Sequence, residues 1–137
     1  MEPKIYPITK IEMGLAAEQE FFWAANGIKI MSLNYSEEMC IAPGAELKVV
    51  EKVNKKEVIR TITLSFNTSN EMPKTGFLSQ RSFRVTTPEG VFLIGNNKVP
   101  YPIANAQRVY GGRPTGNKVW QISVMWTINK PLPMIEQ

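Results

Sequence analysis

Lys118–Ile128 reads Lys-Val-Trp-Gln-Ile-Ser-Val-Met-Trp-Thr-Ile, and this stretch decides the fold of the chain. The even positions from Trp120 to Ile128 are all large and apolar and include Trp126, whereas the odd positions include glutamine, serine and threonine. Strict alternation in β-branched and aromatic residues predicts a strand with one apolar face in a core and a second, more polar face. Because two tryptophans on one face bury a large apolar area, we expect neighbouring strands to pack against them.

A β-hairpin is predicted upstream of this strand, over residues 45–66. Apolar residues alternate with charged or hydroxyl-bearing ones in 45–53 and again in 58–66, and Asn54-Lys55-Lys56 supplies the turn. Arg60 interrupts the apolar face of the second strand, which indicates a sheet margin where its guanidinium reaches water.

A second hairpin is predicted over residues 76–94. Its turn is Thr87-Pro88-Glu89-Gly90, with proline and glycine at the second and fourth positions of a type I turn. The unbroken apolar run 91–94 indicates a central strand that is covered on both faces.

Residues 14–30 have two interpretations. Leu15 to Glu20 are mostly helix formers, and Asn26-Gly27 could end a helix with a left-handed cap. Asn-Gly between two apolar runs is also the strongest short hairpin signal. We favour the hairpin, with a helical turn before Phe21.

Together these segments predict an all-β, single-domain antiparallel β-sandwich or barrel of about seven to eight strands. The domain spans residues 1–137, with an extended N-terminal arm over 1–13 and a long loop region over 95–117. The loop region contains several Gly and Pro residues, and residues 106–110 could form a short strand within it. Apolar runs of about five residues predict no membrane span, and no signal peptide is visible.

The chain contains no histidine and no aspartate, and its 12 acidic residues are all glutamates. A Ser-His-Asp triad and a His-containing metal site are therefore excluded within one chain, as is an aspartate-ligated calcium loop. Cys40 has no histidine to activate it and is the single cysteine of the chain. We expect no enzyme, no catalytic residue, no metal and no cofactor.

The net charge of +4 permits contact with nucleic acid, although the basic residues are scattered along the chain. One alternative function is therefore a nucleic-acid-binding barrel that uses Arg81, Arg84, Arg108 and Arg113. Gly111–Asn117 superficially resembles a phosphate-binding loop but lacks the Gly-Lys-Ser/Thr ending. A further alternative is a sugar or small-ligand module with an open cavity beside the tryptophans.

The arm and the loop region are the expected interfaces, because a loop too long for a mere connection usually carries function. Their candidate residues are Ile5, Tyr6, Ile8, Tyr101, Arg108, Tyr110 and Arg113. An arm of this kind can pair with a neighbouring subunit, but it more commonly packs onto the sheet of its own chain.

Three segments together carry a family resemblance: Val91-Phe-Leu-Ile-Gly95, the Pro-rich loop through Tyr101, and Gly116-Asn-Lys-Val-Trp120. They are similar in style to small all-β structural proteins of tailed bacteriophages, those of tail, neck and capsid surface. The resemblance covers roughly the last 60 residues. It implies a non-catalytic virion component, made in the host cytoplasm, that assembles with protein partners or with copies of itself.

Overall fold

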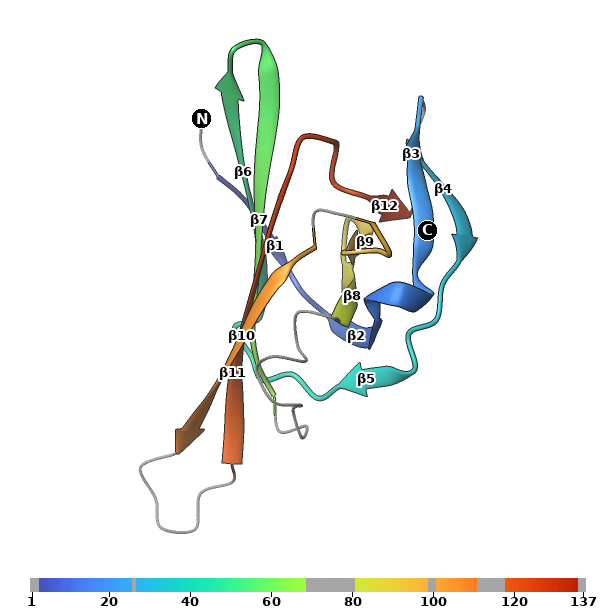
Figure 1. Ribbon diagram of the computed structural model, residues 1–137. Helices are drawn as coiled ribbons and strands as arrows, with labels where there is room; N and C mark the ends of the chain where they lie inside the picture. Colours follow the sequence, from blue (N-terminus) through green and yellow to red (C-terminus); the bar gives the residue numbers. More distant parts are fainter. Residues whose placement is uncertain (1–2, 26, 69–80, 99–100, 111–117, 136–137) are drawn as a thin grey trace.

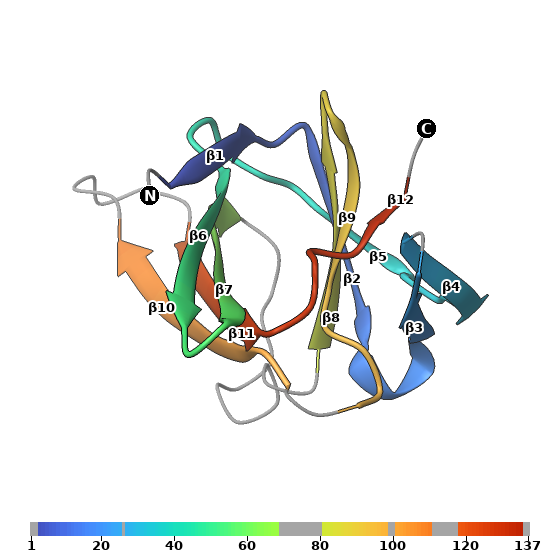
Figure 2. The ribbon, with the colours of Figure 1, turned by 90° about the horizontal axis from the view of Figure 1, so that it is seen from above.

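The computed structural model describes residues 3–25, 27–68, 81–98, 101–110 and 118–135. Two five-stranded antiparallel sheets face each other, and a two-stranded hairpin lies beside the second sheet (Figures 1 and 2). The predicted all-β antiparallel class is confirmed. The sheets do not close into a barrel, and their arrangement is that of a sandwich.

Sheet A contains the longest strands, and its strand order is β1-β6-β7-β11-β10. Their bounds are β1 Lys4–Pro7, β6 Glu46–Asn54, β7 Glu57–Thr68, β11 Lys118–Ile128 and β10 Ile103–Tyr110. Sheet B has the order β12-β9-β8-β2-β5. Its strands are β12 Met134–Ile135, β9 Gly90–Ile94, β8 Arg81–Thr87, β2 Lys10–Leu15 and β5 Glu37–Met39.

The strand over Lys118–Ile128 is β11, and its side chains alternate as predicted. It lies between β7 and β10, with Trp126 opposite Ile62 of β7. Trp126, Ile122 and Val124 are buried in the main core, and the odd positions from 121 to 127 are exposed. Trp120 is half-buried at the end of the same face.

Both predicted hairpins are present, as β6–β7 and β8–β9. The β6–β7 turn places Lys55 and Lys56 at φ 49° and 71°, which are left-handed backbone conformations. Positive φ at both central residues is the requirement of a type I′ hairpin turn. In β9, Phe92 faces the main core and Leu93 faces a second apolar cluster, so this strand is covered on both faces.

The predicted helical turn and hairpin are present within residues 16–25 and 27–32. A 3-10 helix at Ala16–Glu18 (η1) precedes β3 (Glu20–Ala24) and β4 (Gly27–Ser32). The hairpin packs Phe21 against Tyr35 and Leu93 on the outer side of sheet B. Trp23 joins this cluster to the main core, because its ring lies 6.1 Å from that of Trp126.

The expected N-terminal arm does not extend away from the body. Its first half is β1 of sheet A and its second half is β2 of sheet B, so the chain crosses between the sheets at Ile8 and Thr9. Thr9 is fixed there by a 2.9 Å bond from its N–H to the carbonyl of Thr86. The segment predicted as an extended arm is therefore extended over 4–7 and 10–15 and packs onto the sheets of its own chain, the more common of the two outcomes expected for such an arm.

The expected loop region over 95–117 contains a longer strand than the short one predicted over 106–110. Residues 103–110 form an eight-residue strand, β10, which pairs along its whole length with β11. Residues 95–98 are held against the hairpin, since buried Asn96 donates to the Phe21 carbonyl at 3.1 Å and the Asn97 N–H donates to the Gln19 carbonyl at 3.0 Å. Residues 111–117 lie outside the described residues.

The number of strands is larger than predicted. Twelve strands are described, against the seven to eight expected. The additional strands include β1, β5 and β12, which have four, three and two residues. Segments this short carry too few alternating positions to be recognised from their side-chain pattern.

Candidate functional site

The edge of sheet A formed by β10 is the first candidate site. Among the described residues, β10 pairs with β11 on one side and with no strand on the other. In an antiparallel sheet, alternate residues of an edge strand direct their N–H and C=O groups away from the sheet. About half of the eight residues of β10 therefore present backbone donors and acceptors that can pair with a further strand.

The other edges of the two sheets are much less suited to pairing. β1 has four residues, contains Pro7 and follows Pro3. β5 has three residues, two of them glutamates, and β12 has two residues and follows Pro133. Proteins commonly protect sheet edges with short strands, prolines and charges. Within 103–107 of β10 there is no proline and no charge.

Exposed apolar side chains lie beside this edge. Ile103 is 65% exposed and stands directly opposite Met125, which is 48% exposed. Tyr101, two residues before Ile103, is 49% exposed. We define the edge site as the backbone of β10 together with Tyr101, Ile103 and Met125.

The outer face of sheet A beside the edge site is uncharged. In β10 the exposed side chains within 104–107 are Asn105 and Gln107, and in β11 they include Gln121, Ser123 and Thr127. Charged residues make up 20% of the chain, so this face is depleted in charge. Depletion of charge is typical of the central part of protein interfaces.

The predicted interface residues do not gather in one place. Tyr101 lies in the edge site, and the backbones of Arg108 and Tyr110 lie in β10. Ile5 is 54% exposed on β1, at the opposite edge of sheet A. Ile8 is partly buried against the main core. Arg113 lies outside the described residues.

Tyr6 was predicted as an interface residue, but the structure places it in the core. It is 7% exposed, and its ring centroid lies 4.9 Å from that of Phe92 in sheet B. Tyr6 therefore joins the two sheets inside the core. Ile103 and Met125 were missed as site residues, although the odd position of Met125 on an alternating strand already indicates an outward side chain.

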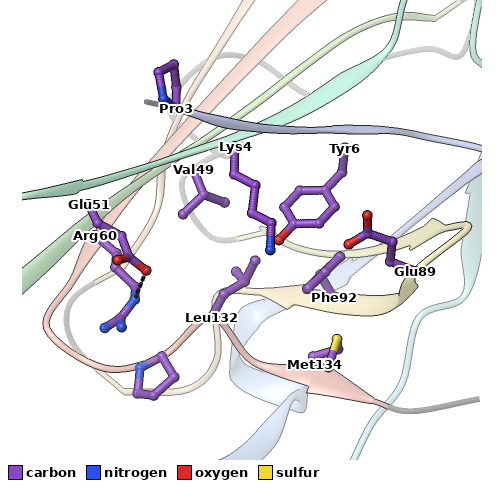
Figure 3. Close-up of a pocket in the computed structure, with 11 residues that line it drawn as sticks. Pro3, Lys4, Tyr6, Val49, Glu51, Arg60, Glu89, Phe92, Leu132 and Met134 are labelled. Atoms are coloured by element: carbon purple, nitrogen blue, oxygen red, sulfur yellow. Dashed lines mark hydrogen bonds and ion pairs between the residues drawn. The ribbon is translucent and has the colours of Figure 1, made fainter. Parts of the chain in front are cut away.

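A cleft between the two sheets is the second candidate site. It has a volume of about 780 Å³ and lies where β1 of sheet A faces β9 and β12 of sheet B (Figure 3). Its apolar lining includes Tyr6, Val49, Phe92, Leu132 and Met134. Its volume falls in the range of small-ligand pockets, roughly 300–1,000 Å³.

The charges around the cleft are balanced. Glu51 accepts a hydrogen bond from Arg60 Nε at 3.0 Å on one side, whereas Lys4 and Glu89 lie on the other side (Figure 3). The hydroxyl of Tyr6 raises the pKa of Lys4, and Glu89 adds to this effect. Two cations and two carboxylates leave no net charge that selects an ionic ligand. Among the described residues, no tryptophan lines this cleft, so the cavity beside the tryptophans that a sugar-binding module requires is not found there.

Arg84, a candidate for nucleic-acid contact, is engaged within the protein. Its Nε and Nη2 donate to the two carboxylate oxygens of Glu12 at 2.9 and 2.6 Å, and its guanidinium lies 5.0 Å from the Tyr35 ring centroid. The hydrogen bonds from Arg84 hold the pKa of Glu12 below its usual range. Burial raises the pKa of Tyr35 to about 12, so its hydroxyl stays protonated and bonds Ser82 at 2.9 Å. Arg81, on the same strand, is half-buried.

Within the described ranges, no group of three or more His, Cys, Asp or Glu residues could hold a metal ion. No helix in that part of the chain has the length and hydropathy needed to cross a membrane. Comparisons with protein-family models, curated proteins and solved structures find nothing that matches this chain.

Proposed function

We propose that this protein is a non-catalytic structural subunit that assembles with neighbouring protein subunits through the edge site. The observation that supports this most is the length of the edge strand β10, which has eight residues, of which 103–107 hold no proline and no charge. Addition of a strand to an exposed sheet edge is a common mode of protein recognition, in which the main chain supplies the hydrogen bonds.

The surroundings of β10 support the same function. Ile103 and Met125 form an exposed apolar pair at the edge, and the adjacent face carries amide and hydroxyl groups. An apolar centre with a neutral polar surround has the composition of a protein interface. A nucleic-acid interface would instead be strongly positive.

The biological setting of this assembly is proposed from the sequence resemblance. Small all-β structural proteins of bacteriophage tails, necks and capsid surfaces assemble into rings or onto lattices. An assembly role without histidine or aspartate chemistry agrees with that setting. The proposed location is therefore the virion.

The proposal is tested by the mass of the particle in solution. Size-exclusion chromatography with light scattering, run at rising protein concentration, should give a mass above the 15.5 kDa of one chain. The variant Ile103→Lys/Asn105→Lys puts two charges on exposed positions of the edge and should lower that mass.

The matched control is Gln121→Lys/Thr127→Lys, which adds the same charge to exposed positions of the neighbouring strand β11. It should leave the mass unchanged. A wild-type chain that stays monomeric at every concentration would refute the proposal. An equal loss of mass in the control would refute the assignment to the edge.

A further inference from the structure

We infer that the strand added to β10 is β10 of a second copy, paired antiparallel about a two-fold axis at Ala106. This inference rests on the proposed function and names the partner and its register. The result is a continuous sheet built from both copies of sheet A.

The lengths of the described edge strands favour a second β10 as the partner. A strand from another edge of the same protein would be β1, β5 or β12, with four, three and two residues. The hairpin strands β3 and β4 have five and six residues. Only β10 matches the eight residues of β10, so self-pairing forms more backbone hydrogen bonds than any of these combinations.

Strand geometry limits the registers that self-pairing can adopt. Opposed residues in an antiparallel pair point to the same face, and successive residues of a strand alternate between faces. The two-fold axis must therefore pass through a residue and not between two residues. Two centres give the longest overlap: Ala106 pairs residues 103–109 with each other, and Gln107 pairs residues 104–110.

The position of Arg108 selects between these two centres. With the axis at Ala106, Arg108 of one copy stands opposite Ala104 of the other, and the two arginine positions are separated by four residues, about 13 Å along the strand. With the axis at Gln107, this separation falls to about 7 Å. Since like charges repel, the Ala106 register has the lower electrostatic cost.

The described side chains fit the Ala106 register. Asn105 of each copy stands opposite Gln107 of the other on the exposed face, where the two amides can hydrogen-bond. Ala106 meets Ala106 on the opposite face, where it packs at the margin of the core. Two methyl groups at the axis give no steric obstacle to close approach of the strands.

Disulfide trapping tests both the partner and the register. In a Cys40→Ser background, the single variants Asn105→Cys and Gln107→Cys are oxidised separately and as an equimolar mixture. Directly opposed residues lie within disulfide reach, whereas the diagonal 105–105 and 107–107 pairs lie at roughly 7–8 Å or more. The mixture should give a covalent dimer of about 31 kDa, twice the 15.5 kDa chain, and each variant alone should remain a monomer on a non-reducing gel.

The outcomes separate this inference from the proposed function. Cross-linking of Gln107→Cys with itself would overturn the Ala106 register. No cross-link in a mixture that light scattering shows to be oligomeric would overturn self-pairing and leave assembly through another strand intact. Gln121→Cys, one strand inward on the same face, is the control and should not cross-link.

Discussion

Gln19 offers the sharpest test of how the β3–β4 hairpin is fixed to the body. It is fully buried, and its side-chain amide makes three hydrogen bonds to the main chain. Nε2 donates to the carbonyls of Leu15 at 2.8 Å and Asn34 at 2.7 Å, and Oε1 accepts from the Asn34 N–H at 2.8 Å. The change Gln19→Leu keeps the size of the side chain and removes all three bonds.

The expected loss of stability follows from the groups left without partners. A fully buried N–H or C=O that loses its hydrogen bond costs about 1–3 kcal/mol, and the three groups left after Gln19→Leu are partly buried, so each should cost about 1 kcal/mol. Burial of an apolar side chain offsets part of this cost. We therefore expect the free energy of unfolding to fall by about 2–3 kcal/mol, a sizeable share of the roughly 5–15 kcal/mol of a typical domain.

Urea unfolding followed by tryptophan fluorescence measures this loss, because Trp23 lies in the hairpin itself. The control is Asn34→Ala, which removes an exposed side-chain bond to Glu18 but keeps the backbone groups that Gln19 binds. It should change stability by about 0.5 kcal/mol. A loss below about 1 kcal/mol for Gln19→Leu would refute the view that unsatisfied backbone groups dominate here.

Three further predictions concern the turn, the ion pair and the central strand. Lys56→Gly should raise the free energy of unfolding by about 1 kcal/mol in urea unfolding, since Lys56 has φ 71°, and a decrease would contradict the type I′ turn. The pKa of Glu12 is lowered in the folded state, so its contribution to stability is present above the unfolded value and is lost as the pH falls from about 4.5 through the folded value. Glu12→Gln should remove this part of the acid dependence, as followed by unfolding midpoints between about pH 6 and 3, and an unchanged profile would argue against the ion pair with Arg84. Trp126→Ala should destabilise by about 3–5 kcal/mol and Gln121→Thr by about 0.5 kcal/mol in calorimetry, and the reverse order would mean that β11 faces inward by its odd positions.

The central part of the fold was predictable because its signals are local. Alternation over Lys118–Ile128 and over the two hairpins identifies strands without any knowledge of their neighbours. Asn26-Gly27 favoured a hairpin over a helix in an ambiguous segment. In the structure β3 pairs with β4, which begins at Gly27. In each case the turn residues and the side-chain period indicate the same element.

The places where sequence reasoning failed depend on contacts between distant residues. Tyr6 is buried because the chain crosses between sheets just after Pro7, which brings Tyr6 against Phe92. No short-range pattern encodes that crossing. From the sequence, Gln19 is an ordinary helix former. In the structure it stabilises the fold through hydrogen bonds to Asn34, 15 residues away.

The sequence predicted the candidate site only in part, again because contacts between distant residues determine it. The segment Ile103–Tyr110 contains two alanines and an asparagine, which are depleted in strands, and it follows Pro100 and Pro102. It becomes a strand because β11 supplies a partner along its whole length. The sequence indicated that this region carries function, but the structure locates the unpaired edge within it.

Hydrogen exchange of the β10 amides, measured at low and high protein concentration, tests the central claim most directly. Assembly through this edge should slow exchange in Ile103–Tyr110 as the concentration rises, because the outward N–H groups gain partners. The amides of β1, at the opposite edge of sheet A, serve as the internal reference and should not change. Exchange in β10 that stays fast at every concentration, while that of another edge slows, would contradict assembly through β10.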